Sequence, residues 1–181
     1  MSQRDSGYER KERDLYETPE WVTEALLPHL PEQVVDIWEP ACASGKMSRV
    51  LGRCPRFVVA TDIHDTEAVA VDFLKVSEPV SGDCDAIITN PPYELATEFI
   101  DKALELMRPP VGFVAMLLRT DFDHAKTRAR LFADHPAFAK KLVLTKRIKW
   151  FEDSKGQPSF NHAWFIWNWQ HTGAPILAYG P

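Results

Sequence analysis

The chain has 181 residues, of which 45% are hydrophobic and 26% are charged, and its formal net charge is −5. This length and composition are typical of one soluble globular domain that can bury a sizeable core. The longest apolar run, from Val111 to Leu118, is far too short to cross a bilayer and argues against a membrane protein.

The N-terminal sequence "MSQRDSGYERKERD" is charged throughout and lacks the apolar stretch of a secretion signal. We expect residues 1–14 to form a flexible polar arm. The three cysteines are odd in number and lack the spacing of metal ligands, and the six histidines are scattered. These features predict reduced thiols in a cytoplasmic protein and no metal site.

Short apolar runs alternate with amphipathic stretches along the rest of the chain. The predicted order is a helix over 18–30, a strand over 33–38, a helix over 47–52, strands over 56–62, 68–74 and 84–89, a helix over 95–107, a strand over 111–118, a basic helix near 123–134, and strands over 140–148 and 162–169. This alternation predicts a doubly wound, Rossmann-like α/β fold with a seven-stranded, mostly parallel sheet. Only a loop joins the last two strands, so the last strand should be antiparallel.

The first predicted helix carries clear start signals, with Thr18 as the N-cap and Pro19 at the first helical position. We expect the domain to span residues 15–170 and to be followed by a tail over 171–181. Polar residues follow several predicted strands at their carboxyl ends, where such sheets bind ligands. These are the Glu39 loop, Asp62, Asp72 and Asn90.

The loop "EPACASGK" (39–46) contains one glycine, Gly45, and has neither the Walker motif nor the three-glycine dinucleotide motif. An acid at the end of the second strand commonly binds ribose hydroxyls, so Glu39, the small residues after it and Asp62 suit a nucleoside ligand. A single aspartate at a strand end is often only a turn or cap residue. The agreement of several such positions favours the ligand site.

The stretch "DAIITNPPYE" (85–94) leads an apolar strand directly into Asn90, Pro91, Pro92 and Tyr93. Prolines end strands, so the motif could be only a strand terminus. Alternatively, it presents Asn90 and Tyr93 to a ligand.

The segment "TNPPY", preceded by "EPACASGK", resembles the class I S-adenosylmethionine-dependent methyltransferases that modify exocyclic or amide nitrogens. "YETPEWVTEALL" (16–27) resembles the cofactor-binding helix of adenine-specific DNA methyltransferases, and the motif order is that of their gamma-type arrangement. The later segments "MLLRTDF" and "HAWFIWNW" are similar to small phage and prophage adenine methyltransferases. The resemblance covers about residues 14–169.

The resemblance implies S-adenosylmethionine as cofactor and assigns roles by position. Glu39 would meet the methionine amino group, Asp62 the ribose, and Asp72 and Phe73 the cofactor's adenine. The full implied cofactor set is Glu17, Thr18, Pro19, Glu39, Pro40, Ala41, Gly45, Asp62, Ile63, Asp72 and Phe73. One departure is Ala43, where relatives usually carry a glycine; alanine costs little there if its φ is negative.

The motif suits methylation of an adenine amine. The Asn90 side-chain oxygen and the Pro91 carbonyl could accept the two N–H bonds of the amine, so that its lone pair points at the methyl donor. Pro91 and Pro92 make the chain stiff, and Tyr93 could stack on the target base. We therefore take Asn90, Pro91, Pro92 and Tyr93 as the catalytic candidates.

The segment over 147–163 lies where these enzymes hold a target-side loop, with Gly156, Ser154 and Lys155 expected to be mobile. The substrate-binding candidates are Arg119, Trp150 and Phe160, with Phe151 as a further aromatic that could stack or wedge. Packing of these aromatics against the sheet is an equally good interpretation. We interpret His162 and His124 as ordinary polar residues.

Residues 119–149 carry a net charge of +6, so the remainder carries −11. This distribution predicts either a phosphate-binding face or only a solvated helix and a lysine-protected edge strand. We expect a nucleic-acid partner, DNA rather than RNA, with target choice made by loops or by a partner protein, because no target-recognition domain is apparent. The alternatives are an RNA nitrogen methyltransferase, a protein glutamine methyltransferase, and an inactive binding subunit.

Overall fold

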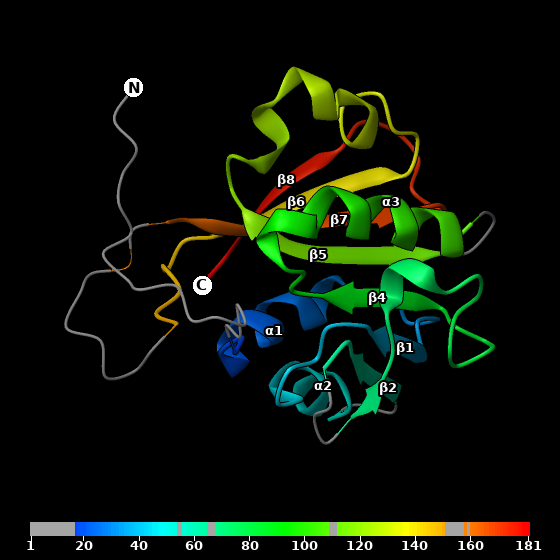
Figure 1. The fold of residues 1–181 in the computed structure, drawn as a ribbon. Helices are drawn as coiled ribbons and strands as arrows, with labels where there is room; N and C mark the ends of the chain where they lie inside the picture. Colours follow the sequence, from blue (N-terminus) through cyan, green and yellow to red (C-terminus); the bar gives the residue numbers. More distant parts are fainter. Residues whose placement is uncertain (1–16, 54–55, 65–67, 109–111, 151–157, 159) are drawn as a thin grey trace.

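The computed structural model describes residues 17–53, 56–64, 68–108, 112–150, 158 and 160–181 (Figure 1). The strands are β1 (Asp36–Glu39), β2 (Phe57–Asp62), β3 (Val69–Ala70), β4 (Ala86–Thr89), β5 (Phe113–Arg119), β6 (Phe138–Leu144), β7 (His162–Asn168) and β8 (Ile176–Gly180). The α-helices are α1 (Glu20–Leu26), α2 (Lys46–Leu51) and α3 (Ala96–Leu106). Short 3-10 helices are η1 (Leu27–His29), η2 (Phe73–Lys75), η3 (Tyr93–Leu95), η4 (Phe122–His124) and η5 (Lys126–Leu131).

The strands form one sheet in the order β3-β2-β1-β4-β5-β7-β6-β8. All neighbouring pairs are parallel except the two that β7 makes with β5 and β6. The predicted doubly wound α/β fold is therefore confirmed, as is the antiparallel pairing of β6 with β7. The strand order reverses between β1 and β4, which is the switch point where ligands bind in such sheets.

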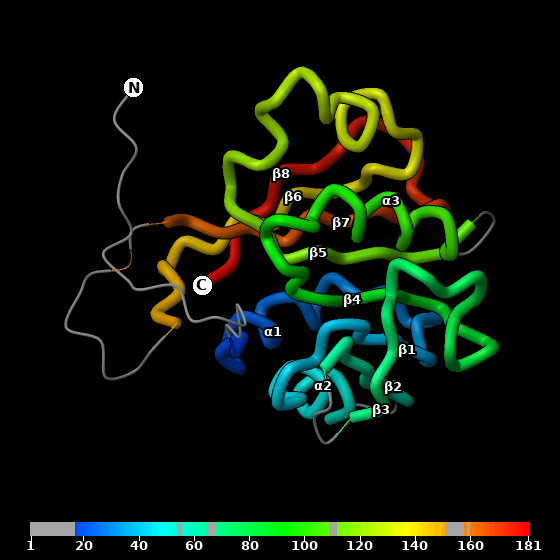
Figure 2. The backbone as a smooth tube through the Cα atoms, viewed as in Figure 1, coloured from blue at the N-terminus to red at the C-terminus, as the bar shows by residue number. Residues whose placement is uncertain are grey.

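Apolar side chains cover both faces of the sheet and produce two cores. On one face α1 and α2 pack over the strands through residues such as Leu26 and Met47. On the other face, α3 and η5 contribute Ile100 and Leu131. The tube in Figure 2 shows the same arrangement, with the sheet between the two helical layers. Strands β5 and β7 are apolar on both faces because both faces are covered.

Within the described residues, the sheet has eight strands instead of the seven predicted. The additional strand, β8, lies within the expected tail and pairs parallel with β6, with Leu142 opposite Ala178. Its side chains are mostly exposed. Its apolar run, Ile176–Tyr179, is only four residues long and follows a Gly-Ala-Pro stretch, so the sequence indicated a tail instead of a strand.

Three other elements differ in detail from the predictions. Helix α1 begins at Glu20 with Pro19 as its N-cap, so Thr18 is buried before the helix and does not cap it. The third strand is reduced to Val69–Ala70, and η2 follows it. The basic segment forms the short helices η4 and η5 instead of one α-helix.

The predicted arm over 1–14 and the central part of the target-side loop, residues 151–157 with 159, lie outside the described residues. Within the described residues no helix has the length and apolar character that a bilayer crossing needs.

Candidate active site

Two carboxylates lie side by side at the switch point. Glu39 ends β1 and Asp62 ends β2, and these strands are parallel neighbours. Glu39 is 2% exposed and accepts a hydrogen bond from the Ser48 hydroxyl of α2. Burial raises the pKa of Glu39 to about 8, and the nearby charge of Asp62 adds to this rise. A cation beside Glu39 would favour the ionised carboxylate.

The loop after β1 folds back against β2. The Cys42 amide donates to the Thr61 carbonyl at 3.0 Å, and the Ala43 amide donates to the Asp62 carboxylate at 2.9 Å. Ala43 has a φ of 47°, in the left-handed region, so the condition under which alanine costs little is not met. This conformation costs about 1–2 kcal/mol for a residue with a Cβ atom. Asp62 thus holds a strained turn in place.

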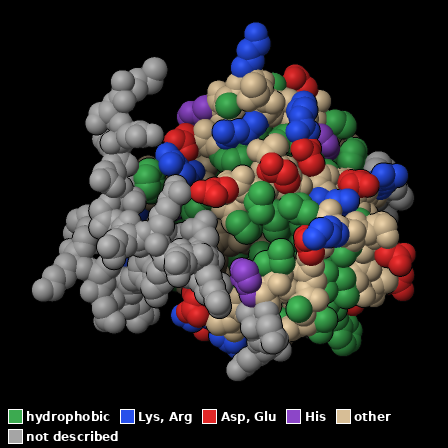
Figure 3. Space-filling model, in the orientation of Figure 1, with side chains coloured by type: hydrophobic (Ala, Val, Ile, Leu, Met, Phe, Trp, Pro, Cys, Tyr) green, Lys and Arg blue, Asp and Glu red, His purple; other side chains and the backbone are tan. Residues whose placement is uncertain are grey.

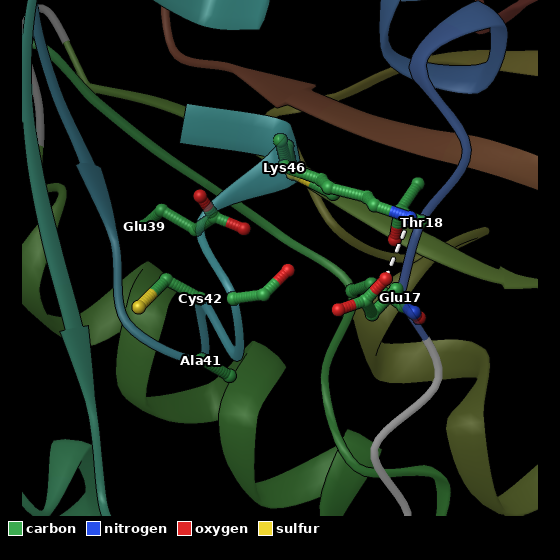
Figure 4. A pocket seen from close by; sticks show the side chains of 9 residues that line it. Glu17, Thr18, Glu39, Ala41, Cys42 and Lys46 are labelled. Atoms are coloured by element: carbon green, nitrogen blue, oxygen red, sulfur yellow. Dashed lines mark ion pairs between the residues drawn. The ribbon is translucent and has the colours of Figure 1, made fainter. Parts of the chain in front are cut away.

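A small pocket that is open to solvent lies beside this loop (Figure 4). Its lining residues are Glu17, Thr18, Glu39, Ala41, Cys42, Ser44, Lys46, Met47 and Asn90. We call this set the acidic pocket. It joins residues that precede α1, follow β1 and follow β4, so three segments that are distant in sequence meet there.

Lys46 crosses one side of the acidic pocket, and its ammonium group lies 2.6 Å from the Glu17 carboxylate. Hydrogen bonds from Lys46 and Ser44 lower the pKa of Glu17. Sequence reasoning placed Glu17 in the site but missed Lys46. The signal for Lys46 was its position directly after Gly45, at the start of α2.

Other residues of the implied cofactor set lie outside the pocket lining. Asp72 caps η2 through the Leu74 amide and pairs with Lys75 at 2.8 Å. Phe73 is 2% exposed and packs against Trp38 and Phe99 in the core. Any contact of Phe73 with a ligand would therefore come from its backbone. Ile63, by contrast, is 59% exposed beside Asp62.

Three members of that set remain, and each has a backbone role: Gly45 is the N-cap of α2 with a φ of 73°, and the other two are Pro19 and Pro40. Pro19 caps α1, and Pro40 is buried directly after Glu39. Both positions are consistent with a pocket whose walls are rigid, because proline fixes its own φ angle.

The Asn-Pro-Pro-Tyr motif begins directly after β4, whose four residues are buried. Asn90 lines the acidic pocket. Pro91 is buried, and Pro92 caps η3 and accepts a hydrogen bond from the Leu95 amide at 3.0 Å. The two prolines thus end the strand and start a turn that separates Asn90 from Tyr93.

Tyr93 contacts a histidine that the sequence analysis interpreted as an ordinary polar residue. The Tyr93 hydroxyl lies 3.0 Å from Nε2 of His162, the first residue of β7. His162 is 2% exposed and lies opposite Arg119 in the β5–β7 register. Burial, reinforced by the charge of Arg119, lowers the pKa of His162 to about 4, so the ring is neutral at physiological pH.

The three substrate-binding candidates all lie around His162. The Trp150 ring meets the His162 ring edge-on, with centroids 5.3 Å apart. The Arg119 guanidinium lies 4.0 Å from the centre of the Phe160 ring. We call Tyr93, Trp150, Phe160, His162 and Arg119 the aromatic cluster. In the sequence, His162 is a single histidine at the start of an apolar run, and nothing there indicated its contacts with Tyr93 and Trp150.

The basic segment is only in part available for phosphate. Three of its cations pair with aspartates, because Arg119 contacts Asp121, Arg130 contacts Asp101 and Lys141 contacts Asp123. Over the face that carries α3, acidic and basic side chains are interspersed and do not form a continuous basic surface (Figure 3).

Two other cations of the same segment, Lys146 and Arg147, are exposed. Lys146 stacks on the Trp21 ring at 5.0 Å, and Arg147 donates to the Asn161 side chain at 2.8 Å. We call Lys146 and Arg147 the basic rim. In the described residues no group of three or more histidine, cysteine or acidic side chains could hold a metal ion.

No protein-family model matches this sequence, and no curated protein is similar to it in sequence.

Solved structures, however, share the fold. A modification subunit assigned to a type I restriction enzyme of Vibrio vulnificus superposes with a TM-score of 0.63 at 12% identity, over 88% of this chain and 45% of that chain. A protein described as a class I S-adenosylmethionine-dependent methyltransferase from Listeria monocytogenes gives 0.59 at 14% identity, over 87% and 62%. A dimethyladenosine transferase from Plasmodium falciparum gives 0.58 at 14% identity, over 85% and 62%.

The chain has a class I methyltransferase fold. The superposition covers 87% of this chain with the Listeria protein and 88% with the Vibrio subunit. At these identities the similarity shows the fold, and this chain spans less than two thirds of the length of each of the three proteins. What the chain binds and modifies must therefore be argued from its own residues.

Proposed function

We propose that this protein uses S-adenosylmethionine to methylate the exocyclic amine of adenine in DNA. The observation that carries the proposal is the acidic pocket, where Glu39 and Asn90 line one cavity. A buried acid suited to a cation and the first residue of an Asn-Pro-Pro-Tyr motif thus face the same space. This is the arrangement needed to bring a charged methyl donor next to an amine.

The residues around the pocket suit the cofactor's polar groups. Glu39 is buried and would ionise beside the methionine ammonium, and Asp62, which already orders the loop, would accept the ribose hydroxyls. Lys46 and Glu17 would close the methionine end. The bound cofactor would supply an electrophilic methyl group on a positively charged sulfur.

The motif would then prepare the nucleophile. The amine nitrogen of adenine is weak because its lone pair is delocalised into the ring. Asn90 and the Pro91 carbonyl, by accepting its two N–H bonds, would hold the nitrogen in a geometry that frees the lone pair. A strong base is not required, because the nitrogen loses its proton readily after methylation. Positioning supplies the rate enhancement.

The target base would lie between the pocket and the aromatic cluster. Base stacking on an aromatic ring such as Tyr93 is worth about 1–3 kcal/mol. A base in a duplex would have to leave the stack, at a cost of a few kcal/mol. The basic rim, Lys146 with Arg147, lies where it could contact the phosphates of the strand that carries that base. A partner protein could add target choice.

RNA is the second candidate substrate, because a 23S rRNA methyltransferase shares the fold over 85% of this chain. The same contacts to adenine would serve in either nucleic acid.

The test is calorimetric titration of the purified protein with S-adenosylmethionine, followed by transfer of a labelled methyl group to unmethylated DNA, to RNA and to protein. Nucleoside mass spectrometry would identify the product. N6-methyladenine in DNA supports the proposal, and methylation of RNA alone selects the second candidate. Binding with label only in protein, or no binding at all, refutes both.

A further inference from the structure

The hydroxyl of Tyr93 has a defined hydrogen-bond partner. Stacking of the Tyr93 ring on a base would not require this bond. A phenyl ring would offer the same face to a base, so the hydroxyl must serve another contact. That contact is Nε2 of His162, at 3.0 Å. The two rings have centroids 6.2 Å apart and are inclined by 31°, so they do not stack on one another, and the hydrogen bond defines their relation.

His162 is itself held firmly. It opens β7 within a seven-residue ladder of pairs with β5, opposite Arg119. Trp150 packs edge-on against its ring, and the side chain is 2% exposed. At neutral pH the buried imidazole is uncharged, and a neutral imidazole has one nitrogen that can accept an O–H bond. The ring is therefore a rigid anchor for a tyrosine hydroxyl.

Tyr93 is less constrained by its own backbone. It opens η3, a single turn of three residues, and its ring orientation depends on two side-chain torsions. One hydrogen bond at the far end of the ring restricts both torsions. The anchor lies on β7 and the ring follows β4, so the bond links two segments 69 residues apart in the sequence.

We propose that His162 is a positioning residue that holds the Tyr93 ring in the orientation needed to receive the target base. The inference rests on the proposed function, because it concerns the same methyl-transfer site. It assigns His162 no proton transfer and no contact with the base. The residue acts through Tyr93, and through Trp150 it connects the segment before β7 with the Asn-Pro-Pro-Tyr motif.

The test compares four variants, namely His162→Leu, His162→Gln, Tyr93→Phe and the double variant Tyr93→Phe with His162→Leu. Glutamine can place a hydrogen-bonding amide near the position of Nε2, so it should rescue function. Leu142→Ala is the matched control, because Leu142 is fully buried on β6 opposite Trp164 of β7 and its side chain cannot hydrogen-bond to Tyr93. Each variant is checked for folding by thermal melting before its rate is measured.

The readouts are the single-turnover rate of methyl transfer to DNA and the affinity for S-adenosylmethionine. We expect His162→Leu and Tyr93→Phe each to lower the rate about tenfold, the effect of losing one well-placed hydrogen bond. The double variant should be no slower than the slower single variant, because both changes remove the same bond. His162→Gln should stay within about threefold of the wild type, and cofactor affinity should be unchanged throughout.

Three results would overturn the inference. The first is a folded His162→Leu protein with the wild-type rate. The second is a double variant in which the two losses multiply. The third is a Leu142→Ala control that loses as much rate as His162→Leu, because the loss would then reflect destabilisation. Failure of the proposed function would look different, since the wild type itself would then transfer no methyl group to nucleic acid.

Discussion

On one side of the Asn-Pro-Pro-Tyr motif lie carboxylates and backbone amides, and on the other side lie aromatic rings. In the acidic pocket, Glu39 is a buried acid with a raised pKa, and Asp62 holds a strained loop. In the aromatic cluster, the titratable side chain of His162 is buried and neutral, and rings contact each other at their edges. We therefore expect the first region to bind the charged cofactor and the second to receive the planar base of the proposed function.

This contrast teaches how one fold can handle two ligands at adjacent positions. The buried acids Glu39 and Asp62 and the strained residue Ala43 lie together in one region, where a bound cation would favour the ionised carboxylates. The aromatic rings lie together in the other region, where a target base could stack on them. Asn90 lines the acidic pocket and Tyr93 belongs to the aromatic cluster, so only the two prolines of the motif separate the two environments in the chain. Variants in each region should therefore fail in different ways.

The largest expected effect comes from Asn90→Ala. Losing the acceptor that orients the amine should lower the methyl-transfer rate by about 10²–10³-fold or more, as removal of a single positioned group does in other sites. Cofactor affinity should change by less than about threefold, because Glu39 and Asp62 remain. Single-turnover kinetics and calorimetry on the same preparation measure both quantities. Retention of the full rate would show that the motif is only a strand terminus.

Glu39→Gln should have the next largest effect, and it should act on binding. Loss of a charge-assisted contact should weaken cofactor affinity by about 10–100-fold. The same change should stabilise the fold. The pKa of Glu39 is about 8 in the folded protein and lies near 4.5 in the unfolded chain, so this group lowers stability as the pH rises between those values.

The stability gain of Glu39→Gln should therefore be greatest at pH 8 and above and should vanish below pH 4.5. Melting temperatures across this range measure it. A variant that is less stable than the wild type at pH 8 would contradict the burial argument.

A proton should leave the protein when the cofactor binds. Below pH 8 the Glu39 carboxyl is mostly protonated in the free protein, and a bound ammonium group would ionise it. Calorimetry at pH 7 in two buffers with different ionisation enthalpies should report release of close to one proton per site, and affinity should rise with pH up to about 8. Glu39→Gln is the control, and equal proton release from it would assign the proton to another group.

Ala43→Gly should have the smallest effect. Glycine relieves the left-handed strain but gains freedom in the unfolded chain, so the net stabilisation should be at most about 1 kcal/mol. Gly45→Ala, at a φ of 73°, is the opposite change and should destabilise by a similar amount. Denaturant unfolding of both variants provides the comparison. A loss of stability in Ala43→Gly would show that the strain at Ala43 is smaller than the entropic cost of glycine in the unfolded chain.

These two regions also differ in how much the sequence revealed. Glu39, Asp62 and Asn90 follow apolar runs, and parallel strands place their carboxyl ends at one edge, so chain order was sufficient to bring them together. His162 depends on the antiparallel pairing of β5 with β7, and its contact with Tyr93 spans 69 residues. No local pattern encodes such a pairing. The conformation of Ala43 was equally hidden, because its φ depends on the contact with Asp62.

The secondary-structure predictions also succeeded for buried elements and failed for exposed ones. The buried strands β4, β5 and β7 were found from their apolar runs, whereas the exposed strand β8 was missed. The basic segment has helix-forming residues, but its ion pairs to Asp101 and Asp123 accompany short turns instead of a long helix. Exposed elements are determined by tertiary contacts more than by periodicity.

The parallel β8 has a practical consequence for handling this protein. The Gly180 carbonyl accepts hydrogen bonds from the backbone amide and the hydroxyl of Thr145, so the strand is attached to the end of β6. Proteolytic loss of residues 175–181 would leave the backbone of β6 exposed as a long new edge, a known template for aggregation. Expression designs should therefore preserve these residues and keep cleavage sites and crystallisation truncations away from them.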